Sequence, residues 1–426
     1  MQYETRMSDS DALMWNIEKD PILRSTITAV AVLDRRPDRE ALLHRIDRGT
    51  RLIPRMRQRV IGNPYSIAPP RWEVDPYFDL RYHVRFLNAG GDGTLRDVLD
   101  IAEPMGMQGF DRAIIQKIHH AITDGVGGMQ MVMTMIDLER EPAPTDEEMP
   151  PAPEAEHMGP LRRTADAFGH VRRRNLGIAR RAGGNLVATA GSVGRLLAPT
   201  PTPLSPIMTG RSMSFRFQTL TFPLPDLKAA AKAASGTLND AFVVAVAGGL
   251  RRYHQRHGTD VESLRMTMPI NIRTEDTSDV AGNQFVPARF IVPVAIDDVT
   301  EHVRAIHELV DQQRHEPANA LVEPLAIVLN RLPTTAVTAL FGSMIKGSDF
   351  TTSNVPGAPI PIYLAGARVE SMIPFGPLVG VAVNVTLLSN LDDVHVGINS
   401  DMAAVPDPEV LLECLQESFE AVLKQA

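Results

Sequence analysis

Hydrophobic residues follow strand and helix periods in turn along the first part of the chain. Residues 25–33 (STITAVAVL) are apolar and rich in β-branched side chains, which predicts a strand, and residues 38–52 carry apolar positions at helical spacing. Residues 114–118 predict a short strand that leads into His119, and residues 129–138 predict a helix. Strands and helices in this mixed order favour an α/β layer.

A second region of strand and helix patterns begins near residue 212. The predicted strands are residues 214–223, 264–269, 285–294, 382–388 and 394–399, and the predicted helices are residues 225–234, 239–254, 299–314, 333–344 and 408–424. The residues between the last two strands, Asn390-Leu391-Asp392-Asp393, predict that these strands pair. The sequence therefore predicts two mixed α/β domains, at residues 1–140 and 212–426.

The connecting region, residues 141–211, has a different composition in each of its two parts. Residues 141–160 contain six acids and six prolines, which is typical of an exposed linker. Residues 161–195 contain eight arginines and one acid, Asp166, with an apolar side that begins at Leu161, Ala165 and Phe168. Arginines beside an apolar stripe are typical of a peripheral contact with anionic lipid, but a solvated connector between domains is an equal alternative.

Composition and charge exclude several classes of protein. The formal net charge is -8 and aromatic residues make up 5% of the chain, so neither the basic surface nor the stacking platform of a nucleic-acid-binding protein is expected. A single cysteine, Cys414, excludes a disulfide framework and favours the cytoplasm. No stretch approaches the roughly 18 apolar residues of a membrane span, so we expect any membrane contact to be peripheral.

One cluster of residues could carry chemistry: His119-His120-Ala121-Ile122-Thr123-Asp124-Gly125, at the junction of a predicted strand and helix. An imidazole with a pKa of about 6.5 is a natural base near neutral pH. Asp124 could orient the imidazole directly, or pair with an arginine and hold the loop. Gly125 would let the backbone and a substrate come close.

Three other interpretations compete with a catalytic one. A histidine is more often structural than catalytic. Adjacent histidines on a strand point to opposite faces, which argues against a shared metal ion. Thr123 or Asp124 could simply cap the helix that follows.

The His119-His120-x-x-x-Asp124-Gly125 motif resembles the signature of the chloramphenicol acetyltransferase-like, CoA-dependent acyltransferases. Further blocks resemble bacterial wax ester synthase/diacylglycerol acyltransferases, in that family's order: residues 79–85 near Trp72, residues 237–240 (TLND), 269–273 (PINIR), 282–284 (GNQ) and 352–357 (TSNVPG). The resemblance implies two domains with mixed sheets and a central channel between them.

The chain departs from this family at one place. The family places a strand with a Pro-Leu-Trp block before the double histidine, whereas here residues 109–113 run directly into Ile114, and Pro70-Arg71-Trp72 lies too far upstream to be that block. By this comparison a segment between Ala113 and Ile114 is lacking, either through a genuine deletion or because the sequence omits it. A deletion would remove a strand and part of the acyl pocket.

The resemblance also implies roles for individual residues. His120 would be the general base, with His119 beside it, and Asp124 would hold the loop through an arginine such as Arg273. Gly125 would leave room for substrate. Asn271 and Ser353 with Asn354 are candidates for polar contacts, although Asn and Ser-Asn-x-Pro-Gly are also common turn formers. Capping of the helix that follows is the favoured interpretation for Asn239-Asp240.

The reaction implied is transfer of a long-chain fatty acyl group from acyl-CoA, as co-substrate, to diacylglycerol or a long-chain alcohol. No permanently bound cofactor and no metal are expected, and the protein would be cytoplasmic or peripheral on the inner membrane face or on lipid inclusions. Two alternatives remain: a lipid-binding or acyl-CoA-binding relative with impaired or no catalysis, and a condensation-type enzyme that uses carrier-protein thioesters. The sequence leaves the acceptor, the acyl chain length and the oligomeric state open.

Overall fold

The structure is a computed structural model. It describes residues 5–62, 68–88, 90–105, 113–119, 122, 128, 131–142, 148–154, 158–181, 202–271, 285–314, 326, 329–330 and 333–426.

A six-stranded sheet forms the centre of the C-terminal half, in the order β5-β12-β11-β8-β6-β7. Its strands are β5 (Phe215–Pro223), β6 (Ser263–Asn271), β7 (Phe285–Pro293), β8 (Phe350–Pro356), β11 (Val383–Asn390) and β12 (Asp393–Asp401). The β11–β12 pair is antiparallel through Asn390↔Asp393, which confirms the predicted hairpin. β8 runs parallel to both β11 and β6, so the sheet is mixed.

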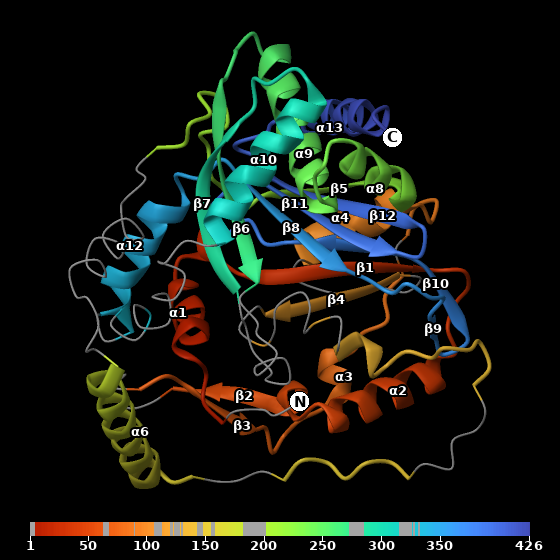
Figure 1. Cartoon of the computed structure of the whole chain (residues 1–426). Helices are drawn as coiled ribbons and strands as arrows, with labels where there is room; N and C mark the ends of the chain where they lie inside the picture. Colours follow the sequence, from red (N-terminus) through yellow and green to blue (C-terminus); the bar gives the residue numbers. More distant parts are fainter. Residues whose placement is uncertain are drawn as a thin grey trace.

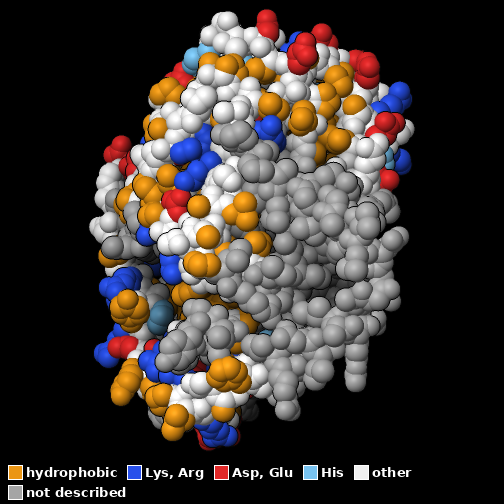
Figure 2. Space-filling view, turned by 90° about the vertical axis from the view of Figure 1, so that its left-hand side faces the viewer, with side chains coloured by type: hydrophobic (Ala, Val, Ile, Leu, Met, Phe, Trp, Pro, Cys, Tyr) orange, Lys and Arg blue, Asp and Glu red, His pale blue; other side chains and the backbone are white. Residues whose placement is uncertain are grey.

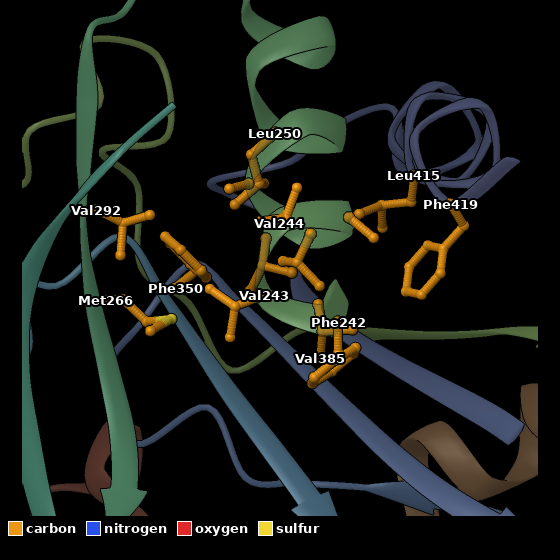
Figure 3. Close-up of a cluster of buried hydrophobic side chains, with 14 of the residues drawn as sticks. Phe242, Val243, Val244, Leu250, Met266, Val292, Phe350, Val385, Leu415 and Phe419 are labelled. Atoms are coloured by element: carbon orange, nitrogen blue, oxygen red, sulfur yellow. The ribbon is translucent and has the colours of Figure 1, made fainter. Parts of the chain in front are cut away.

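Four helices cover one face of this sheet: α8 (Leu224–Ala233), α9 (Leu238–Arg256), α10 (Val299–Arg314) and α13 (Pro408–Leu423) (Figure 1). α9 is apolar on nearly all sides, since it packs between the sheet and the other helices. Phe242 and Val243 of α9 meet Val385 of β11, and Phe419 reaches the same core from α13 (Figure 3). This is the main hydrophobic core of the described residues.

The second sheet has four strands in the order β4-β1-β10-β9. They are β1 (Thr26–Leu33), β4 (Ala113–His119), β9 (Tyr363–Leu364) and β10 (Ala367–Phe375). β1 is antiparallel to both β4 and β10. The sheet thus combines strands from the beginning of the chain with strands near its end, across the division predicted at residues 140 and 211. That division itself stays a prediction.

The N-terminal half adds α1 (Asp9–Ile17), α2 (Arg39–Leu52), α3 (Leu80–His83), α4 (Leu95–Met105), the 3₁₀ turns η1 (Pro21–Leu23) and η2 (Pro54–Arg57), and a two-stranded sheet of β2 (Gln58–Ile61) and β3 (Arg71–Val74). The connecting region contributes α6 (Pro160–Arg181), which lies beside β2 and β3 (Figure 1). The helix α12 (Thr334–Ile345), from the C-terminal half, lies above α6 and near α1 (Figure 1). This mixture of helices and sheets confirms the predicted fold class.

One predicted helix is shorter than expected. The pattern at residues 129–138 predicts a helix, but among the described residues of this stretch only 131–133 are helical. The Thr134 hydroxyl donates to the Met131 carbonyl (2.7 Å), and Asp137 forms a β-bridge with Tyr363 and an ion pair with Arg45. These contacts draw the chain out of the helix, because side chains that bond to nearby backbone groups compete with helical hydrogen bonds.

No single helix among the described residues is both long enough and apolar enough to cross a membrane. α8 and α9 would pass that test only together, and they bend by 94° at their junction.

Candidate functional site

β4 is an edge strand of the four-stranded sheet and ends at His119, the first residue of the double histidine. It pairs with β1 along its full length, and its last residue, His119, lies opposite Thr26. The predicted strand before the motif is thereby confirmed. His120, Asp124, Gly125 and Arg273 lie outside the described residues, so their roles stay predictions.

Buried polar side chains line the face of the six-stranded sheet that meets β10. Asn384 and Thr386 of β11 and Asn399 of β12 are each less than 5% exposed. Asn384 donates to the Pro377 carbonyl (3.0 Å) and accepts from the Thr386 hydroxyl (2.8 Å), while Asn399 donates to the Gly376 carbonyl (3.0 Å). We call Asn384, Thr386 and Asn399 the polar inner cluster.

The polar inner cluster lies at the same end of the four-stranded sheet as His119. Phe375 at the end of β10 is opposite Thr28 of β1, and Thr26, two residues earlier, is opposite His119. Pro377, which the Asn384 amide holds, follows two residues after the end of β10. Two strand spacings separate β10 from β4, or roughly 10 Å.

Some buried polar atoms on this inner face have no hydrogen-bond partner among the described residues. In the described part of the chain, no hydrogen-bond partner reaches the buried Oδ1 of Asn399 or Oγ1 of Thr219. Farther along β12, the His395 ring contacts the Thr221 hydroxyl at 3.1 Å, and burial lowers the pKa of His395, which favours its neutral form. A buried polar atom without a partner is costly, so the inner face is suited to a ligand with polar groups.

Ser353 and Asn354 lie on opposite faces of β8. Ser353 pairs in register with Thr386, so it shares the inner face with the polar inner cluster. Asn354 pairs with Leu387, whose side chain belongs to the helix-covered core, and Asn354 itself is exposed. The strand therefore brings only Ser353 of the two to the inner face.

Asn271 is the last residue of β6, where β6 has parted from β8. The two strands pair only at Met266↔Phe350 and Thr267↔Thr351, although both continue beyond this point. β6 continues to pair with β7 as far as Asn271↔Phe285. The sheet thus splits between β6 and β8, next to Ser353.

Of the predicted capping pair Asn239-Asp240, Asp240 takes part in the cap of α9, whereas Asn239 lies in the first turn of the helix. Thr237 is the N-cap, and the Asp240 carboxylate accepts hydrogen bonds from the Thr237 backbone N–H and hydroxyl, both at 2.8 Å. The same carboxylate contacts the His307 ring at 2.7 Å. Asp240 is thus used in holding the start of α9.

Sequence reasoning did not single out the polar inner cluster. Its signal was present in the alternation Val383-Asn384-Val385-Thr386-Leu387, in which polar residues occupy every second position of a strand inside a hydrophobic half. The same alternation is typical of a strand with one face in water. Only the packing of β10 against this face shows that it is buried.

Two family models together match almost the whole chain. The model for the wax ester synthase/diacylglycerol acyltransferase catalytic domain matches residues 7–112 and 104–242, and the model for the WS/DGAT C-terminal domain matches residues 281–422. The catalytic-domain match breaks into its two parts just before β4, next to the place where the sequence comparison predicts a lacking segment.

A candidate diacylglycerol O-acyltransferase of Mycobacterium tuberculosis (strain H37Rv) is 35% identical to this chain, and the alignment covers 99% of this chain and 93% of the relative. The aligned stretch of 460 residues is longer than the 426 residues of this chain, so the relative has residues for which this chain has no counterpart.

Two solved structures share the fold. The wax ester synthase/diacylglycerol acyltransferase of Marinobacter aquaeolei VT8 matches with a TM-score of 0.62, 21% identity and 99% coverage of both chains. The starter condensation domain of rhizomide synthetase, solved in complex with C8-CoA, matches with a TM-score of 0.57, 12% identity and coverage of 99% of this chain and 94% of that one. At these identities the likeness establishes the two-domain, chloramphenicol acetyltransferase-like fold.

Proposed function

Because the chain belongs to the wax ester synthase/diacylglycerol acyltransferase family, we propose that it transfers a fatty acyl group from acyl-CoA to the hydroxyl of diacylglycerol or of a long-chain alcohol. The observation that carries the proposal is the family match over both halves of the chain, with His119, the first histidine of the motif, as the last residue of β4.

The proposed chemistry needs one positioned base. A hydroxyl is a weak nucleophile at neutral pH, so His120 takes its proton as the oxygen attacks the thioester carbonyl. The tetrahedral intermediate collapses with cleavage of the carbon–sulfur bond, and the proton passes from His120 to the leaving CoA thiolate. The products are an ester and free CoA, and no covalent bond to the protein forms.

The polar inner cluster supports this site as a positioning element. Asn384 and Asn399 hold the carbonyls of Pro377 and Gly376, which follow the end of β10, and β4 ends at the same end of the four-stranded sheet. Ser353 shares this face and offers a hydroxyl to a polar group of the substrate. Donors fixed in a buried site stabilise a developing oxyanion more than donors in water.

We propose acyl-CoA, rather than a carrier-protein thioester, as the donor. The curated relative with 35% identity is assigned to diacylglycerol O-acyltransferases, and the condensation domain that shares the fold was solved with an acyl-CoA bound. We further propose that the protein works in the cytoplasm at the surface of a membrane or lipid inclusion, because its acceptors dissolve in lipid.

The decisive experiment mixes purified protein with palmitoyl-CoA and dispersed diolein or hexadecanol, and follows the release of free thiol. Replacing His120→Ala should lower the rate by about 10²–10⁴-fold, the usual contribution of general base catalysis. His44→Ala, at an exposed histidine of α2, is the matched control and should keep the full rate.

Other results would favour the alternatives. Tight binding of palmitoyl-CoA without turnover would favour a lipid-binding relative, for which the break in the catalytic-domain match before β4 is the relevant observation. Turnover only with an acyl group on a carrier protein would favour a condensation-type enzyme. Equal rates for His120→Ala and the unchanged protein would exclude His120 as the base.

A further inference from the structure

α6 packs against the protein with its polar side. Arg163 forms a bidentate pair with Glu73 of β3, with Nε–Oε1 at 3.1 Å and Nη2–Oε2 at 2.8 Å. Asp166 pairs with Arg6 and, at 2.5 Å, with Arg71. Of the described side chains of α6, Ala167 alone is fully buried.

The apolar side of the same helix faces outward. Leu161 is 88% exposed and Phe168 is 61% exposed, and Ala165 between them is also exposed. These residues are spaced i, i+4 and i+7, so they form one continuous strip. Arg162, also exposed, flanks it. We call Leu161, Arg162, Ala165 and Phe168 the outer face of α6.

This orientation is the reverse of what an amphipathic helix on a globular surface shows, where the apolar strip faces the core. The ion pairs of Arg163 and Asp166 fix the orientation, and they leave two large apolar side chains in contact with water. An exposed apolar strip of this kind is typical of a binding surface for a partner outside the part of the protein against which α6 packs.

The charge around the outer face indicates which kind of partner would bind there. Asp166 is the single acid among residues 161–195, and Arg6 and Arg71 engage it on the inner side. Burial works to raise the pKa of Asp166, but the two arginines outweigh burial and hold that pKa below its ordinary value, so the carboxylate remains charged. The one charged side chain of the outer face is therefore positive, that of Arg162, and Arg172, Arg173 and Arg174 follow in the same helix.

We infer that the outer face of α6 docks the protein on the surface of an anionic lipid bilayer. Leu161 and Phe168 enter the boundary between headgroups and acyl chains, and Arg162 pairs with lipid phosphates or other anionic headgroups. A second copy of this chain fits less well, because it would bring a basic face against a basic face. Figure 2 looks onto the side of the molecule where α6 lies in Figure 1, and hydrophobic and Lys or Arg side chains lie next to each other in its lower part.

The inference deepens the proposed function and rests on it, because it names the surface from which a lipid alcohol would be taken up. It favours the lipid-contact interpretation of this segment, since a merely solvated connector would not need to turn an apolar strip outward.

The test is cosedimentation of the purified full-length protein with vesicles of phosphatidylcholine alone or with added phosphatidylglycerol. The unchanged protein should bind the anionic vesicles and lose binding as salt is raised. The double variant Leu161→Ser, Phe168→Ser should bind the anionic vesicles at least tenfold more weakly, and Arg162→Glu should bind about tenfold more weakly and with a smaller dependence on salt.

Two matched control variants change exposed residues outside α6. Ile291→Ser removes an exposed apolar side chain of β7 (53% exposed), and Arg304→Glu reverses an exposed charge on α10. Both should bind vesicles like the unchanged protein. His120→Ala should also bind unchanged, so a protein without acyltransferase activity still tests the docking surface.

Three results would overturn the inference: no binding of the unchanged protein to anionic vesicles, equal binding by the outer-face variants and the controls, or an outer-face variant that changes the oligomeric state but not vesicle binding. The last result would assign the outer face to a second copy. Circular dichroism of each variant checks that a loss of binding does not come from unfolding.

Discussion

Among the described residues of the C-terminal half, burial favours the neutral form of three histidines, His254, His302 and His395. His254 is fully buried in α9, where Nδ1 lies 2.7 Å from the Leu250 carbonyl and Nε2 lies 2.8 Å from the Ser205 hydroxyl. Because Nδ1 faces a carbonyl, it carries the proton, and Nε2 accepts from Ser205. Burial lowers the pKa of His254, as it does for His302 and His395.

The lowered pKa of His254 predicts a loss of stability in mild acid. The unfolded chain takes up a proton near pH 6.5 and the folded chain does so only at lower pH, so the free energy of unfolding falls as pH decreases from about 6.5 toward the folded pKa. Each buried histidine contributes at most about 1.4 kcal/mol per pH unit to this slope. Urea unfolding between pH 5 and 8 should show a shallower slope for His254→Gln.

The control for that prediction is His44→Gln, at an exposed histidine, which should keep the slope of the unchanged protein. A His254→Gln protein with the original slope would mean that carboxylates, rather than this histidine, set the response to acid.

At the scale of elements, local sequence fixed how α9 begins. The capping box of Thr237 and Asp240 satisfies backbone donors at the start of a helix that supplies much of the main core. The residues of this box also form one of the blocks that resemble the acyltransferase family. The contacts of Asp240 with Thr237 and His307 account for its burial without a role in catalysis.

Replacing Thr237→Ala should lower the free energy of unfolding by about 1 kcal/mol, because the hydroxyl of the cap is lost. Acyltransferase activity per folded molecule should remain the same. Thr237→Ser, which keeps the hydroxyl, should recover most of the stability. Loss of activity in Thr237→Ala at unchanged stability would instead place this block at the substrate.

At the scale of the whole molecule, the two sheets touch where β12 crosses β10. A Cβ at Gly397 of β12 would lie 1.7 Å from the Pro374 carbonyl oxygen, so only glycine allows this approach. Nearby, Phe217 of β5 stacks on Phe375 of β10 with ring centroids 4.2 Å apart. These contacts fix the position of the end of β10 relative to β11 and β12, which carry the polar inner cluster.

Gly397→Ala should therefore destabilise the protein by about 1–3 kcal/mol, the usual cost of overpacking, because backbone atoms must move apart. It should also reduce acyltransferase activity per folded molecule, since the sheets that carry the proposed site shift relative to each other. Gly159→Ala is the control, because a Cβ there meets nothing within 4 Å. Thermal unfolding and the thiol-release assay measure both effects, and a fully active, stable Gly397→Ala protein would contradict the prediction.

The sequence by itself determined the local elements, because a helix and a strand that bury one face repeat their apolar positions with different periods. The β11–β12 hairpin, α9 with its cap, α13 and the strand before the double histidine follow from such patterns. Motif spacing also determined the family, since the matching blocks are short and contiguous.

Only the tertiary structure decided which strands pair and which faces pack against each other. Periodicity indicates that a face is covered but not by what, so it could not place β10 beside β1, nor show that the alternating polar residues of β11 are buried. It could not choose between Ser353 and Asn354, because their faces depend on the register of β8 with β11. The direction of α6 was equally hidden: the sequence shows an apolar strip but not what that strip faces, and only the long-range pairs of Arg163 and Asp166 show that it is turned outward.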